Sequence, residues 1–131
     1  MFLGLRTVIY PAPDLAERKE WFARLLGLEP YFDEPFYVGF NVAGYELGLD
    51  PQADPAEGPI TYWGVADADR ALRLLLEAGA NAGGAVSEVG GGIQVATVRL
   101  PGDGGILGII ENPHFQLAEP PSTASSPGAG R

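Results

Sequence analysis

The two halves of the chain repeat one sequence phrase, and this repeat constrains the fold more than any other feature. Residues 5–27 read LRTVIYPAPDLAERKEWFARLLG, and residues 60–79 read ITYWGVADADRALRLLLEAG. Each phrase is an apolar run, an Asp, an amphipathic helix pattern and a Gly. A repeat of about 50 residues usually marks one supersecondary unit that cannot bury its apolar face alone. Two copies therefore predict two modules that pair around a shared site.

Local signals predict the order β-α-β-β-β for the first module. A strand over 5–10 precedes a helix over 14–26, which Asp14 caps and Gly27 ends. Three short strands are then expected, at residues 29–33, 36–42 and 45–49.

The second module repeats this order with a strand over 60–65 and a helix over 67–78. Clear strands follow at 94–100 and 106–111, while many glycines obscure the pattern before them. No helix pattern follows Gly90-Gly91-Gly92, so these glycines indicate a mobile hairpin tip rather than a phosphate-binding loop.

We therefore expect one domain over residues 1–116 and a low-complexity tail over 117–131. Within the domain, the expected parts are module one at about 3–51, a linker at 52–59 and module two at about 60–115.

Bulk properties exclude several classes of protein. The chain has 131 residues, enough to bury roughly two-thirds of its unfolded surface without a disulfide or a metal. It has no cysteine, so it contains no disulfide and no thiolate metal ligand. Its formal net charge of −9 argues against nucleic acid and anionic membrane surfaces as partners. No segment resembles a signal peptide or a membrane span, so we expect a cytoplasmic protein.

The repeated module, with the phrases DLAERKEWFARLLGLEP and DGGILGIIENP, resembles the vicinal oxygen chelate superfamily over about residues 3–115. This superfamily includes glyoxalase I, bleomycin-resistance proteins, fosfomycin-resistance enzymes and extradiol dioxygenases. The resemblance implies an α+β fold in which two βαβββ modules form a curled mixed sheet around a shared cleft. It also implies a homodimer, and in enzymatic members a divalent metal in the cleft.

The family's metal-ligand positions can be carried over one at a time. Two of them, on the first strand of each module, correspond to Thr7 and Ile60, and the one in the last strand corresponds to Gly108. A further position corresponds to Glu46 or Gly48, depending on register. Only Glu46 could bind a metal, so we expect no metal and no cofactor.

The residue counts point the same way. The chain has one histidine, His114, and no cysteine, so it cannot supply a two-histidine, one-carboxylate site. We expect His114 to be a structural or exposed histidine near the C-terminal edge rather than a site residue.

Strand alternation predicts which side chains face the cleft. In 36–42, the apolar set Phe36, Val38, Phe40 and Val42 is expected to face the helices. The candidate ligand-binding residues are on the opposite faces of the strands: Thr7, Tyr37, Asn41, Glu46, Tyr62 and Arg99.

Arg99 enters this set because RLPG aligns with NVAG, which places it in the position of Asn41. A guanidinium inside a cleft needs a partner, either Glu46 or an anionic group on a ligand. Aromatic side chains near Asp33 could stack on a flat ligand, seal a dimer interface or pack in the core. They are Tyr31, Phe32, Phe36 and Tyr37.

These residues favour a metal-independent small-molecule binding protein that resembles the bleomycin-resistance members. Its cleft suits a partly aromatic, possibly anionic ligand. The alternative is a glyoxalase-like lyase or isomerase in which Glu46 is a metal ligand or general base. A third possibility is a subunit or regulatory module with an unused cleft.

Overall fold

The computed structural model describes residues 1–102 and 104–117. The first module begins with strand β1 (Gly4–Pro11) and helix α1 (Leu15–Leu26). Strands β2 (Phe32–Glu34), β3 (Tyr37–Val42) and β4 (Tyr45–Asp50) complete it. A single 3-10 turn, η1 (Pro55–Glu57), lies in the connection to the second module.

The second module repeats the order with strand β5 (Ile60–Gly64) and helix α2 (Ala68–Glu77). Two short strands follow, β6 (Asn81–Ala82) and β7 (Ser87–Glu88). Strands β8 (Gln94–Arg99) and β9 (Ile106–Glu111) end the module.

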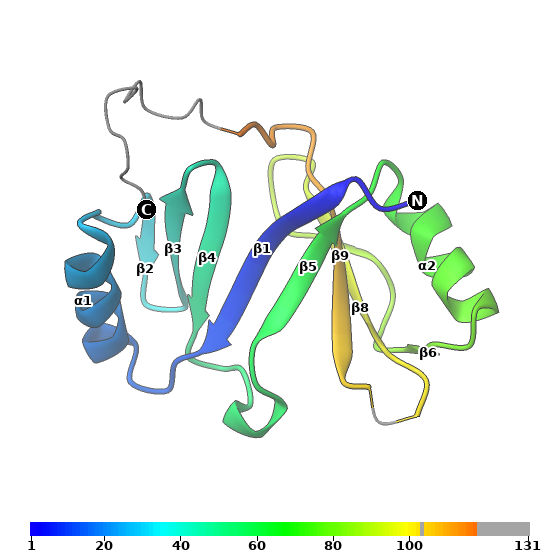
Figure 1. Ribbon diagram of the computed structural model, residues 1–131, viewed down its shortest axis with the longest axis horizontal. Coiled ribbons are helices and arrows are strands. Elements are labelled where there is room, and N and C mark those ends of the chain that lie inside the picture. Colours follow the sequence, from blue (N-terminus) through cyan, green and yellow to red (C-terminus); the bar gives the residue numbers. More distant parts are fainter. Residues whose placement is uncertain (103, 118–131) are drawn as a thin grey trace, which may run out of the picture.

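The nine strands of the described residues belong to one curled mixed sheet, in the order β2-β3-β4-β1-β5-β9-β8-β6, with β7 also paired to β8. The first strands of the two modules, β1 and β5, pair antiparallel in the middle, and each pairs in parallel with the last strand of its own module. Figure 1 shows β1 and β5 crossing the centre, with α1 and α2 at the two ends of the sheet. The expected fold of two βαβββ modules is confirmed.

Each helix covers its own small apolar core. Against α1 lie Ala12, Val38, Phe40 and Leu49, and Phe40 and Leu49 have no exposed surface. The second core joins Ala68 and Ala71 of α2 to Val65, Ala96 and Ile109. Because each helix packs on one end of the sheet, the other side of the central strands is left free to line a site.

The helix caps follow the repeated Asp. Asp14 Oδ1 accepts a hydrogen bond from the backbone amide of Glu17, and Asp67 Oδ1 accepts one from that of Arg70. Gly27 takes the left-handed conformation that ends α1, with a φ of 67°. The same local chemistry therefore sets both strand-to-helix turns.

The structure corrects two details. The strand expected at 29–33 is observed as β2 over Phe32–Glu34, so residues 29–31 are not part of it. Phe36 precedes β3 and is 62% exposed, so it does not share the helix-facing side with Val38 and Phe40.

The expected tail at 117–131 lies outside the described residues except for Leu117. None of the described helices is both long and apolar enough to cross a membrane.

Candidate ligand-binding cleft

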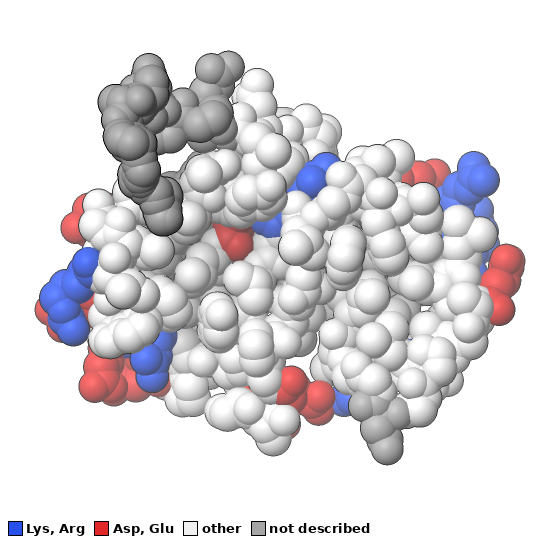
Figure 2. All heavy atoms as spheres, in the orientation of Figure 1, with Lys and Arg blue, Asp and Glu red and all other residues white. Residues whose placement is uncertain are grey.

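A cavity of about 740 Å³ lies between the two modules. Aromatic and aliphatic side chains form most of its walls, and a few polar groups complete them. In the space-filling view, charged side chains lie mainly at the flanks, and acidic and basic atoms also lie in the hollow near the middle (Figure 2). The lining residues are Arg6, Thr7, Ile9, Tyr31, Phe32, Phe36, Tyr37, Asn41, Gly44, Tyr45, Glu46, Tyr62, Val89, Ile93, Val95, Ile110, Asn112, His114, Phe115 and Gln116.

Four of the six expected site residues form one row across the sheet. Asn41 pairs with Glu46, Glu46 with Thr7, and Thr7 with Tyr62, so the row crosses β3, β4, β1 and β5. Tyr37 also lines the cavity, two residues before Gly39 on the same face of β3. Five of the six expected residues therefore line one cavity.

Glu46 is held in this row by neighbouring hydroxyl groups. Thr7 Oγ1 donates to Oε1 at 3.3 Å, and Tyr31 Oη donates to Oε2 at 2.5 Å. Hydrogen bonds to a carboxylate compensate for part of the water that it loses on burial. The polar wall of the cleft therefore contains a carboxylate with fixed geometry.

The tyrosines around Glu46 stay protonated over a wide pH range. Burial, and next the negative charge of Glu46, raises the pKa of Tyr37 above its ordinary value of 10.0. Burial and the hydrogen bond to Glu46 raise the pKa of Tyr31 in the same way. The pKa of Tyr62 is raised by burial and, to a smaller extent, by Asp50. All three hydroxyls therefore keep their proton at neutral pH, and Tyr31 donates its proton to Glu46.

These shifts predict a loss of stability at high pH. A group with a raised folded-state pKa adds stability below its unfolded pKa and loses it as the pH rises further, because the unfolded chain releases its proton first. We expect the melting temperature to fall as the pH rises above about 10. The Tyr37→Phe variant should show a shallower fall. Thermal unfolding between pH 8 and pH 11 measures the fall in both proteins. An equally steep fall of the melting temperature in the wild type and in Tyr37→Phe would contradict a raised pKa of Tyr37.

Two glycines make room for tyrosine rings in the cleft. A Cβ atom added to Gly48 would lie 2.6 Å from Cζ of Tyr37, and one added to Gly108 would lie 2.6 Å from Cε2 of Tyr62. Real Cβ atoms essentially never approach other atoms so closely. The LG phrase that ends each module therefore allows a tyrosine to pack directly on the backbone of the last strand.

The residues of this cleft do not fit the metal site that the resemblance implies for enzymatic members. The ring of Tyr62 fills the space that a side chain at position 108 would need, and Ile60 offers no ligand atom. Among the described residues, no three Asp, Glu or His side chains come together as a metal site would require. Glu46 is bonded instead to Thr7 and Tyr31. The absence of a bound metal remains a prediction.

Arg6 lines the cavity, although alternation would turn it away from the cleft. The pairing of β1 with β5 is irregular between Leu5 and Thr7, so Arg6 is the extra residue of a β-bulge. Bulges re-aim side chains and interrupt alternation. The side chain lies against Gly64 and its guanidinium carbon lies 3.8 Å from the centre of the Phe115 ring.

Arg99 does not line the cavity, contrary to the expectation from the repeat. Its guanidinium donates to Glu57 Oε2 at 2.8 Å, and its side chain is 55% exposed. Val95, on the same face of β8, does line the cavity. Arg99 is the last residue of β8, and its exposed side chain pairs with Glu57 outside the cavity, so its expected place in the cleft is wrong.

The segment after β9 closes one side of the cavity. A ring nitrogen of His114 lies 2.8 Å from the carbonyl oxygen of Gly91, at the tip of the β7–β8 hairpin. The ring of Phe115 packs near Tyr45 of the first module, with ring centres 6.0 Å apart. His114 is thus exposed but lines the cavity, which the sequence did not indicate.

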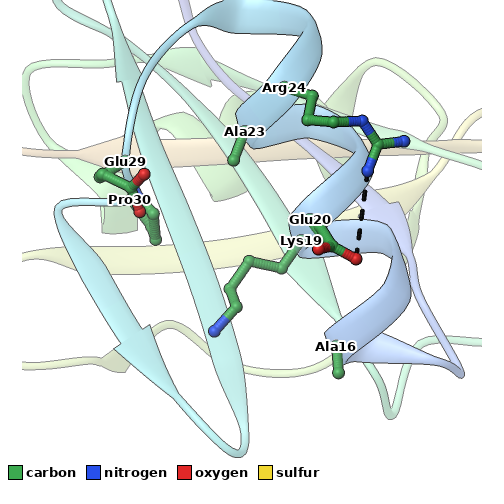
Figure 3. A pocket seen from close by; sticks show the side chains of 7 residues that line it. All are labelled: Ala16, Lys19, Glu20, Ala23, Arg24, Glu29 and Pro30. Carbon is green, nitrogen blue, oxygen red and sulfur yellow. Dashed lines mark ion pairs between the residues drawn. The ribbon is translucent and has the colours of Figure 1, made fainter.

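A second depression, of about 550 Å³, lies beside α1 and residues 29–30. Figure 3 shows that Lys19, Glu20 and Arg24 project from this helix, with Arg24 and Glu20 paired at 4.0 Å. Such charged, water-exposed walls offer little apolar contact to a small molecule. The cleft between the modules is therefore the better candidate site.

Comparison with solved structures shows the same fold in several proteins. Methylmalonyl-CoA epimerase from Streptomyces coelicolor, in complex with 2-nitronate-propionyl-CoA, aligns with a TM-score of 0.68 and 15% identity over 88% of this chain and 99% of its own. A glyoxalase/bleomycin resistance protein/dioxygenase superfamily member from Vibrio splendidus aligns with a TM-score of 0.60 and 16% identity, over 82% and 97%.

A Legionella pneumophila protein described as an NAD-dependent benzaldehyde dehydrogenase aligns with a TM-score of 0.63 and 19% identity, over 79% and 96%. No family model matches the sequence, and no curated protein does. The chain has the vicinal oxygen chelate fold, as the resemblance implied. One fold hosts many functions, so its activity must be argued from the cleft.

Proposed function

We propose that this protein binds a small, partly aromatic, anionic molecule in the cleft between its modules, without a metal. The observation that carries the proposal is the cavity of about 740 Å³, with a polar row on its floor and apolar walls. Ligand pockets typically combine such a volume with few polar groups that fix orientation. In this respect the protein resembles the drug-binding members of the superfamily.

The distribution of side chains supports an aromatic ligand. Four tyrosines line the cavity, and their rings can stack on a flat molecule. Val89, Ile93, Val95 and Ile110 supply an aliphatic wall in the second module. Arg6 lines the cavity and supplies a positive charge that suits an anionic group on the ligand.

An enzymatic role for Glu46 is the second candidate. A carboxylate that faces an apolar cavity and is held by two hydroxyls could accept a proton from a bound substrate. A lyase or isomerase of the glyoxalase kind would also need to polarise an enediolate, a task that a metal usually performs. The misfit at positions 60 and 108 therefore favours binding over catalysis.

A thermal-shift screen of EDTA-treated protein tests the proposal. Aromatic acids that bind at a hundred times their dissociation constant should add about 2.7 kcal/mol to the free energy of unfolding. Elemental analysis of the purified protein should find no stoichiometric Zn, Ni, Fe or Mn. The proposal would be overturned if ligands stabilised the protein only after a divalent metal was added.

A homodimer and a cytoplasmic location are also part of this proposal, and both are inferred from the sequence and its resemblance. Light scattering of the purified protein would give its mass in solution. A mass equal to that of one chain would contradict the proposed dimer but not the proposed binding cleft.

A further inference from the structure

We propose that Arg6 and Glu46 select and orient a ligand that carries an anionic group at one end and a hydrogen-bond donor, such as an ammonium group, at the other. This inference rests on the proposed binding function and names the chemistry of its ligand. It requires two opposite charges that share one cavity, stay apart and keep free bonding positions.

Among the residues that line the cavity, Arg6 carries a positive charge and Glu46 a negative one. In the described part of the chain, ion pairs join Lys19 to Asp33, Arg24 to Glu20 and Arg99 to Glu57, and none joins Arg6 to Glu46. Opposite charges in a cleft with apolar walls attract strongly unless other groups hold them. Their separation therefore needs a structural cause.

Arg6 is held by groups that leave its edges free. Its guanidinium lies over the Phe115 ring at 3.8 Å, and Nη1 donates to the carbonyl oxygen of Leu5 at 3.2 Å. A guanidinium has five N–H donors in its plane, so stacking on one face leaves most of them available. This arrangement suits a carboxylate or another planar anion.

Glu46 is held in a comparable way by neutral donors. Thr7 and Tyr31 each donate to one of its oxygens. The Tyr37 hydroxyl also interacts with Glu46. A carboxylate has about four acceptor positions, so at least one remains for a ligand. An ammonium or hydroxyl group is the complementary partner, whereas a second carboxylate would be repelled.

The uncharged walls of the cavity determine what joins the two ends of the ligand. Ile9, Tyr62, Val95 and Ile110 line the cavity together with these residues. They offer aromatic and aliphatic contact rather than further charge. A ligand with a compact hydrophobic body and two polar ends of opposite character matches this arrangement.

Three probes with the same phenyl body test the inference by NMR titration. Phenylacetate carries the anionic group, phenethylamine carries the ammonium group, and 4-(aminomethyl)phenylacetate carries both at opposite ends. The proteins compared are the wild type, Arg6→Gln, Glu46→Gln and the control Arg99→Gln. Arg99→Gln removes a guanidinium outside the cavity, so it should leave all three affinities unchanged.

We expect effects of opposite sign in the two cleft variants. Arg6→Gln should weaken phenylacetate about tenfold or more and should strengthen phenethylamine, since each result follows from one lost positive charge. Glu46→Gln should do the reverse. The probe with both groups should bind tightest to the wild type and lose affinity in both variants. A purely structural role for these residues would weaken all probes together.

The outcomes separate this inference from the proposed function. If probes bind in the cavity but both variants weaken them equally, or not at all, the charge-based selection is wrong and the binding cleft stands. If no probe and no aromatic acid perturbs cavity residues of the wild type, both proposals fail.

Discussion

Replacement of Phe40 with Ala should lower the free energy of unfolding by about 3–5 kcal/mol. Phe40 has no exposed surface and packs under α1, with its ring centre 6.4 Å from that of Phe22. Truncation would remove a large buried apolar surface and leave a cavity. Urea denaturation of the purified variant measures the loss directly.

Phe36→Ala is the matched control, because Phe36 is 62% exposed and lies on the cleft side of the same segment. Its loss should cost less than about 1 kcal/mol, as is usual for exposed positions. Equal destabilisation by the two substitutions would contradict the burial of Phe40 under α1 and the exposure of Phe36 at the cleft.

Replacement of Gly108 with Ala should destabilise the protein by about 1–3 kcal/mol. The new Cβ would lie 2.7 Å from Cγ of Tyr62, near the base of that side chain, so the ring could not escape by a small rotation of its tip. The cost arises from the contact between the two residues. It should therefore nearly vanish when Tyr62 is also replaced with Ala.

A double-mutant cycle isolates this contact, because it subtracts the separate effects of each substitution. The required measurements are the unfolding free energies of the wild type, Gly108→Ala, Tyr62→Ala and the double variant. Strict additivity would show that Tyr62 does not pack on Gly108. It would also remove the main physical argument that position 108 has no room for a metal ligand.

The repeat and strand alternation predicted much of the cleft because both depend on short-range rules. The Asp-helix-Gly phrase gave both helices to within a residue or two at each end. Alternation gave the row of Asn41, Glu46, Thr7 and Tyr62, since residues that face one side of a regular strand keep doing so.

Other features could not be predicted in this way. A bulge breaks alternation, and nothing in LRTV announces the one that turns Arg6 toward the cavity. The repeat alignment placed Arg99 in the cleft, whereas its side chain is exposed and pairs with Glu57 outside the cavity. His114 contacts the β7–β8 hairpin, and Phe115 contacts the first module. Both contacts join segments far apart in the sequence, which local patterns do not encode.

The most direct test of the central claim is ¹⁹F NMR of EDTA-treated protein labelled with fluorotyrosine and titrated with 4-(aminomethyl)phenylacetate. Four of the five tyrosines, Tyr31, Tyr37, Tyr45 and Tyr62, line the cavity, and Tyr10 packs against Phe22 instead. A metal-independent ligand-binding cleft predicts that the four signals shift and that of Tyr10 does not. Shifts that required an added divalent metal, or that were confined to Tyr10, would contradict it.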